Sequence, residues 1–284
     1  GGLLAIRGSE LVELSAQSLM DWAGVFGVVD QERLSAREFC TISGYPIIRL
    51  GNVKNTAGEL MAMFADFPAL HSEADVQYDP VSERPVWHTD STFRKHPPIG
   101  SIFHCRQAPP DGAATLFADT RGAYAGLDEA TKAMLEPLEA VCSLAHHDKK
   151  ISLYSPDYPN LTPKQRKANP PNRVPVVLKH PVNGIPALYG LNSSTCAIMP
   201  VGEEITGENL DKWDLEGVED ESVLILRNLL PYITGPEFTV KWNWQPGDIV
   251  AWDNRCTLHA ATGFDYDRYT REMWRLTLLD RVAA

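Results

Sequence analysis

The sequence lacks the features that would assign it to a membrane or nucleic-acid-binding class. It contains no run of about 18 apolar residues, so we expect no membrane-spanning helix. Its 26 basic residues are outnumbered by 37 acidic ones, which gives a formal net charge of -11. Nucleic acids and anionic membranes are bound by clustered Lys and Arg, so neither is expected as a partner. A small anionic ligand remains compatible with this balance, because the local charge of a pocket need not follow the net charge.

Cysteine is scarce and scattered. The chain has five cysteines and no Cys-x-x-Cys pair, which argues against a zinc ribbon or a disulfide framework and is typical of a reducing compartment. Residues 1–7 show no basic segment followed by an apolar one, so we expect no signal peptide and a cytoplasmic protein. The missing initiator Met leads us to expect a processed chain, or one cut from a longer protein.

The chain shows no internal repeat, low-complexity segment or clear linker. Its 284 residues, 44% of them hydrophobic, are enough for one large core, and we expect a single domain over residues 1–284. Apolar residues at helical spacing predict a helix that stops at Gly27, a second that starts near Asp128, and a third over about 220–230. Thr162-Pro163 predicts the N-cap and first residue of a further short helix.

The last fifty residues have the periodicity of strands. Residues 238–244 alternate strictly between apolar and polar side chains, 249–252 form a short apolar run, and 273–279 alternate again. The turn Gln245-Pro246-Gly247-Asp248 separates the first two of these segments. Strands joined by Pro/Gly turns, with helices mainly elsewhere, predict a mainly β sandwich or jelly roll with helical insertions.

One His-x-Asp triplet has the spacing of a metal-binding pair. On an extended segment His88 and Asp90 point to the same side and can reach one ion. A third ligand from a distant strand would complete a two-His-one-carboxylate triad, which leaves one face of an octahedral ion open and suits Fe(II). His259 follows an apolar run and is the best candidate; His104 and His180 lie in strand-like segments and are the alternatives.

His146-His147-Asp148 repeats the same spacing, so the triplet alone is weak support for a metal site. Two lysines follow it, which indicates an exposed, charged loop. His88 instead follows Trp87 and precedes Ser-Thr-Phe, which indicates a partly buried setting. We therefore favour the triplet at 88 over the one at 146.

Two arginines share a face of the last predicted strand. Arg271, Met273, Arg275 and Thr277 lie opposite Trp274, Leu276 and Leu278. The arginines either form a solvated exterior or, inside a barrel, each binds a carboxylate through two hydrogen bonds. Their Cα atoms would be about 13 Å apart, which suits two different anions better than one shared group.

The sequence resembles the taurine and phenoxyacetate dioxygenase family of Fe(II)- and 2-oxoglutarate-dependent enzymes. The resemblance runs from about residue 3 to 280. Its blocks are residues 87–93, 114–121 and 180–189, and the strongest is 244–259 with the two arginines beyond it. It implies a double-stranded β-helix, a jelly roll of the cupin-like kind, with helical insertions.

The resemblance also implies roles for individual residues. His88, Asp90 and His259 would hold Fe(II), and the triplet at 146 would have no ligand role. Arg271 and Thr115 would bind the distal carboxylate of 2-oxoglutarate, the co-substrate that is used with O2. Arg275 corresponds to an arginine that can hold the acid group of the primary substrate.

The chain departs from the family pattern in three places. An N-terminal stretch that usually precedes the segment at 4–8 is missing. Residues 28–33 stand where taurine-using members carry a motif with His and Tyr, which argues against taurine as the substrate. One extra residue between His259 and Arg271 falls in the loop 263–266.

The expected function is therefore oxidation of a C–H bond in a small anionic substrate, such as a carboxylate, sulfonate or sulfate, with succinate and CO2 as co-products. Two alternatives stay open: desaturation or cyclisation of an amino-acid-like substrate, and a non-catalytic cupin-like protein that binds a metal and an anion. Relatives of this kind also lead us to expect a homo-oligomer.

Overall fold

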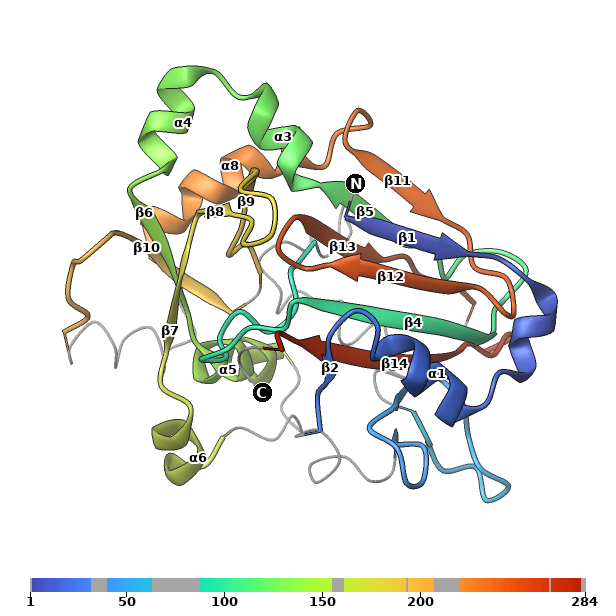
Figure 1. Ribbon diagram of the computed structural model, residues 1–284. Coiled ribbons are helices and arrows are strands. Elements are labelled where there is room, and N and C mark those ends of the chain that lie inside the picture. The colour runs from blue at the N-terminus through green and yellow to red at the C-terminus, as the bar shows by residue number, and fades with distance from the viewer. Residues whose placement is uncertain are drawn as a thin grey trace.

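The largest sheet of the protein carries the N-terminal and C-terminal strands. The computed structural model describes residues 2–31, 40–62, 87–154, 161–192, 194–206, 220–265 and 267–281. Five strands follow one another in the antiparallel order β1 (Leu3–Ile6), β12 (Ile249–Asp253), β4 (Gly100–Gln107), β14 (Glu272–Leu279) and β2 (Val28–Val29). A sixth, β3 (Ile48–Gly51), also pairs with β14. Strands β1, β12, β4 and β14 lie side by side in Figure 1.

A three-stranded sheet packs against the large one. Its order is β11 (Thr239–Trp242), β5 (Thr115–Asp119) and β13 (Thr257–Ala261). Phe117 of this sheet shares one apolar core with Phe103 and Met273 of the large sheet. The side chains that face each other from the two sheets therefore enclose a common interior, and the candidate site lies in it.

A second apolar core lies under the helices on the other side of the molecule. Here β6 (Leu138–Cys142) runs between β10 (Thr195–Pro200) and β7 (Asn172–Pro175), beside the hairpin of β8 (Val177–Lys179) and β9 (Pro186–Leu188). Helices α3 (Thr120–Gly126), α4 (Glu129–Leu135) and α8 (Leu224–Ile233) pack on this part (Figure 1). The fold is thus mainly β with helical insertions, as expected.

The four predicted helices are confirmed, with shifted ends. Helix α1 (Ala16–Ala23) begins after a Ser15 cap and ends before Gly24, where turns replace the expected last helical residues. Asp128 caps α4, and Thr162 and Gln165 form a capping box at α6 (Pro163–Ala168). A 3-10 turn (Glu221–Val223) precedes α8. None of the helices in the described ranges has the length and apolar character needed to cross a bilayer.

Two expectations are wrong in detail. The alternating segment 238–244 forms a strand only over 239–242, and Val240 is 46% exposed although it belongs to the apolar face. Among the described strands β11 pairs with β5 alone and is an edge strand, and its apolar side is not fully covered. The segment at 146–148 lies in helix α5 (Leu144–Tyr154) instead of an exposed loop, and both His146 and Asp148 are buried. In a helix, successive side chains are rotated by about 100° around the axis. Buried side chains can therefore lie next to charged residues in the sequence.

Candidate metal centre

The candidate metal centre begins with a pairing between residues far apart in the sequence. His88 N donates to the His259 carbonyl at 3.0 Å, and His259 N donates back to the His88 carbonyl at 2.9 Å. This isolated antiparallel bridge attaches the His88 segment to β13. It sets the two imidazoles next to each other, with ring centroids 4.2 Å apart.

The structure brings His88, Asp90 and His259 together. Asp90 Oδ1 lies 3.9 Å from His88 Nε2 and 3.8 Å from His259 Nε2. One ligand atom from each residue falls within 4.8 Å of the others, and no other His, Cys, Asp or Glu group among the described residues does so. Two ligand atoms that bind one ion at about 2.1 Å lie about 3 Å apart, so the three side chains would need only a small inward movement to bind the same ion.

The electrostatics of the site favour the protonation states that a metal requires. Burial is the largest influence on the pKa of Asp90 and would raise it, but Arg275, the two imidazoles and Ser101 hold that pKa well below its usual range. Burial lowers the pKa of His259 to about 3, and the neighbouring His88 adds to this effect. At neutral pH the carboxylate is therefore charged and this imidazole is neutral, as metal ligands must be.

Asp90 has two partners on its second oxygen. Ser101 Oγ donates to Asp90 Oδ2 at 2.7 Å, and Arg275 Nη2 lies 2.9 Å from the same atom. Ser101, which was not predicted as a site residue from the sequence, lies on β4 with its side chain fully buried. The only signal in the sequence is strand alternation, which sets Ser101 on the same face as Phe103.

The two arginines lie in the interior, so the solvated-exterior alternative is wrong. Arg275 lies on β14 and is 7% exposed, and Arg271, the residue directly before β14, is 3% exposed. Arg275 lies 6.0 Å from the ring of Phe103. Burial raises the pKa of Cys105 to about 12 against the opposing charge of nearby Arg271.

Thr115 is buried at the start of β5. Its Oγ1 accepts a hydrogen bond from Trp244 Nε1 at 2.9 Å. The Trp244 indole N–H can only donate, so it uses one lone pair of the Thr115 oxygen. The hydrogen of the Thr115 hydroxyl is therefore left to donate to another acceptor. Trp244 was noted in the sequence only as part of a motif, and its contact with Thr115 depends on the tertiary fold.

The alternative third ligands have other contacts. His104 Nε2 lies 2.8 Å from the Leu11 carbonyl, and burial lowers the pKa of His104 to about 4. His180 Nε2 lies 2.9 Å from Asp253 Oδ2, which also pairs with Arg255. Neither histidine belongs to the metal-ligand group formed by the described residues.

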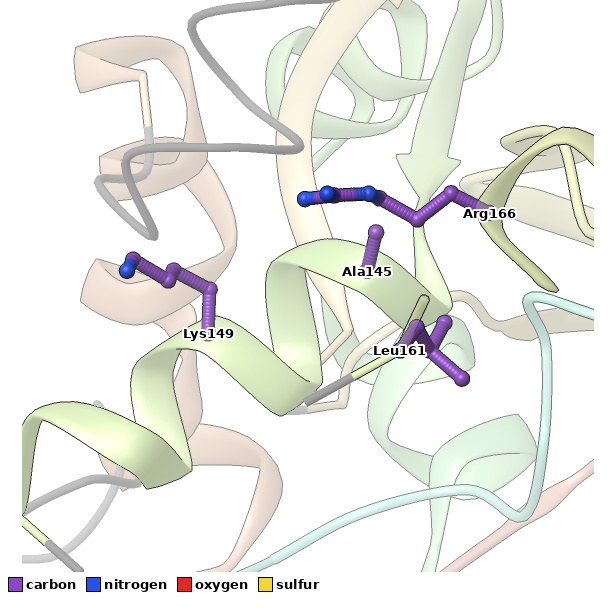
Figure 2. A pocket seen from close by; sticks show the side chains of 4 residues that line it. All are labelled: Ala145, Lys149, Leu161 and Arg166. Atoms are coloured by element: carbon purple, nitrogen blue, oxygen red, sulfur yellow. The ribbon is translucent and has the colours of Figure 1, made fainter. Parts of the chain in front are cut away.

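A separate hollow of about 200 Å³ lies between α5 and α6. Figure 2 shows its lining residues Ala145, Lys149, Leu161 and Arg166. Its charged lining is cationic and contributes neither a carboxylate nor an imidazole. The metal-ligand chemistry of the described residues is therefore concentrated at the triad.

Comparison with known proteins identifies the family. Residues 3–277 match the model described as "Taurine catabolism dioxygenase TauD, TfdA family". The chain belongs to this family. Over 197 residues it is 32% identical to an alpha-ketoglutarate-dependent 2,4-dichlorophenoxyacetate dioxygenase of Burkholderia sp. (strain RASC), a match that covers 69% of this chain and 58% of that protein.

Two further TauD/TfdA comparisons extend the match. An alpha-ketoglutarate-dependent sulfate ester dioxygenase of Pseudomonas putida is 31% identical over 201 residues, which cover 69% of this chain and 60% of the relative. The chain thus spans less than two thirds of the length of both curated relatives. The crystal structure of AAD-2 in complex with Mn(II) and N-oxalylglycine is similar with a TM-score of 0.70 and 26% identity, covering 98% of this chain and 84% of that one.

Proposed function

We propose that this TauD/TfdA family member is an Fe(II)- and 2-oxoglutarate-dependent dioxygenase that oxidises a C–H bond of a small anionic substrate. The observation that carries the proposal is the convergence of His88, Asp90 and His259 in an interior that also contains two buried arginines. The proposal includes a single domain over residues 1–284 with the double-stranded β-helix topology. It also includes a cytoplasmic homo-oligomer without nucleic-acid or membrane partners.

The residues of the triad fit Fe(II). Their ligand atoms lie within 4.8 Å of one another and come from two imidazoles and one carboxylate, the donor set typical of non-haem Fe(II) oxygenases. When bound, Fe(II) with 2-oxoglutarate and O2 supplies the oxidation of the C–H bond and yields succinate and CO2. His88, Asp90 and His259 would hold the ion from one side and leave its other side to the co-substrates.

Arg271 and Thr115 would hold the distal carboxylate of 2-oxoglutarate. Both side chains are buried: Arg271 directly precedes β14 of the large sheet, and Thr115 begins β5 of the small sheet. In such a setting an arginine binds a carboxylate strongly because both partners are shielded from water. The Thr115 hydroxyl, which accepts from Trp244, keeps its hydrogen for the same carboxylate.

Arg275 would hold the acid group of the primary substrate. Its Nε is buried without a hydrogen-bond partner among the described residues, which favours a role for this group in binding an incoming anion. The relatives that are named for 2,4-dichlorophenoxyacetate and for sulfate esters support a carboxylate or sulfate substrate. The absent His/Tyr motif argues against taurine.

The function can be tested in two steps. Anaerobic addition of Fe(II) and 2-oxoglutarate should produce a visible charge-transfer band, which His88→Ala should lose. With O2, a panel of aryloxyacids, alkyl sulfates, sulfonates and amino acids should then be screened for substrate-stimulated succinate, formed in equal amount with oxidised product. If the wild-type protein gives no band and no O2-dependent succinate, the proposed function is wrong.

Trp244→Phe should raise the KM for 2-oxoglutarate about fivefold with a smaller change in kcat. The substitution keeps an aromatic ring beside Phe103 but removes the donor that orients the Thr115 hydroxyl, and a lost hydrogen bond of this kind costs about 1 kcal/mol. Steady-state succinate assays at varied 2-oxoglutarate measure this. Trp22→Phe is the matched control: Trp22 lies on α1 and packs against Phe26, so this variant should keep the wild-type KM.

A further inference from the structure

The two carboxylate oxygens of Asp90 have different surroundings. Oδ1 lies 3.8 and 3.9 Å from the imidazole nitrogens of the triad. Oδ2 is directed away from them, toward Ser101 and Arg275. A carboxylate can bind a metal through one oxygen or through both, and these contacts decide which oxygen is available.

Ser101 and Arg275 contribute differently to this arrangement. The Ser101 hydroxyl makes an aligned 2.7 Å hydrogen bond to Oδ2, from a side chain that is fully buried. Arg275 Nη2 lies at 2.9 Å, but its N–H is not aligned as a hydrogen bond to any described residue. Arg275 therefore supplies charge, whereas Ser101 supplies the directional contact.

The local backbone explains why Asp90 needs such a contact. Asp90 lies in a turn, and the next residue, Ser91, has the positive φ of 49° that L-residues rarely adopt. Ser101, in contrast, lies on β4 between β12 and β14, paired with Trp252 on one side and Thr277 on the other. Its hydroxyl ties a ligand on a turn to an inner strand of the large sheet.

We propose that Ser101 is a positioning residue of the metal centre: it holds Asp90 Oδ2, so that Asp90 offers the ion only Oδ1. A carboxylate limited to one oxygen uses one coordination position and leaves a face of an octahedral ion open for 2-oxoglutarate and O2. Partners that orient metal ligands typically contribute a factor of about 10–100 in metal affinity. The inference rests on the proposed function, because it requires that the triad binds a metal.

The test is anaerobic Co(II) titration by calorimetry and visible absorption, with the melting temperature of the metal-free protein measured in parallel. Ser101→Ala should weaken Co(II) binding about tenfold to a hundredfold and shift the Co(II) absorption bands. Ser101→Thr keeps the hydroxyl on a strand-compatible side chain and should restore both properties. Thr277→Val is the control, since it removes a buried hydroxyl directly across from Ser101.

The outcomes separate this inference from the proposed function. If Ser101→Ala binds Co(II) as tightly as the wild type or more tightly, or changes only the melting temperature, Ser101 has no positioning role. The proposed function would survive either result. If the wild-type protein itself shows no Co(II) binding that His88→Ala abolishes, the metal centre fails, and the inference fails with it.

Discussion

Asp90→Asn should lower the affinity for Fe(II) or Co(II) at least about a hundredfold and O2-dependent succinate formation about a thousandfold. The substitution removes the only carboxylate of the triad and replaces it with a neutral, weaker ligand. It also leaves the buried charge of Arg275 without its 2.9 Å partner, so the site becomes cationic and repels the ion. Anaerobic metal titration and a succinate assay measure the two effects.

The controls for this prediction come from the chain itself. Breaking a buried ion pair costs about 3–5 kcal/mol, so the folded fraction of Asp90→Asn must be checked by circular dichroism. His88→Ala provides a second variant, because the His88 side chain is 33% exposed and tolerates truncation better. Asp148→Asn alters the other His-x-Asp triplet and should leave metal affinity unchanged. If Asp148→Asn lowers the affinity as much as Asp90→Asn, the choice between the triplets is wrong.

Local rules predicted much of the site. The i, i+2 spacing brings His88 and Asp90 to one side, and strand alternation sets Arg271 and Arg275 on one face. His88 and Asp90 do converge in the structure, although Asp90 lies in a turn. Both arginines are buried, although Arg271 lies one residue before β14. The choice of His259 over His104 needed more than spacing. The apolar run before His259 favoured it, and the family resemblance then implied the same residue. In the structure a backbone bridge between distant segments brings it to His88.

The features that sequence analysis missed depend on tertiary contacts. Ser101 is one alternating residue of a strand, and its importance comes from the turn that returns Asp90 to it. The burial of His146 and Asp148 was missed because the adjacent lysines dominated the local pattern, whereas α5 buries part of its surface. Val240 was expected to be buried because alternation reveals a face but not whether another layer covers it. Such coverage is a property of the assembled sheets.

Arg271→Gln should raise the KM for 2-oxoglutarate about a hundredfold, with a smaller effect on kcat at saturation. A buried arginine that binds a carboxylate contributes up to about 3 kcal/mol, and each 1.4 kcal/mol corresponds to about tenfold. Glutamine keeps a polar side chain of moderate length but loses the charge and the paired N–H donors. Initial rates of succinate formation at varied 2-oxoglutarate, with Fe(II) and the primary substrate saturating, give both constants.

Arg49→Gln is the matched control for Arg271→Gln. Arg49 lies on the neighbouring strand β3 and pairs at 2.9 Å with Glu272, the residue after Arg271. Its replacement removes a cation that pairs with the residue next to Arg271 but keeps the buried Arg271 guanidinium. The KM for 2-oxoglutarate should therefore stay within about twofold, because partly exposed ion pairs contribute little. If Arg271→Gln raises the KM of the primary substrate and leaves that of 2-oxoglutarate unchanged, the roles given to Arg271 and Arg275 must be exchanged. Arg271 precedes β14 and Arg275 lies within it, so each would then still have its own anion, because four residues of extended chain span about 13 Å.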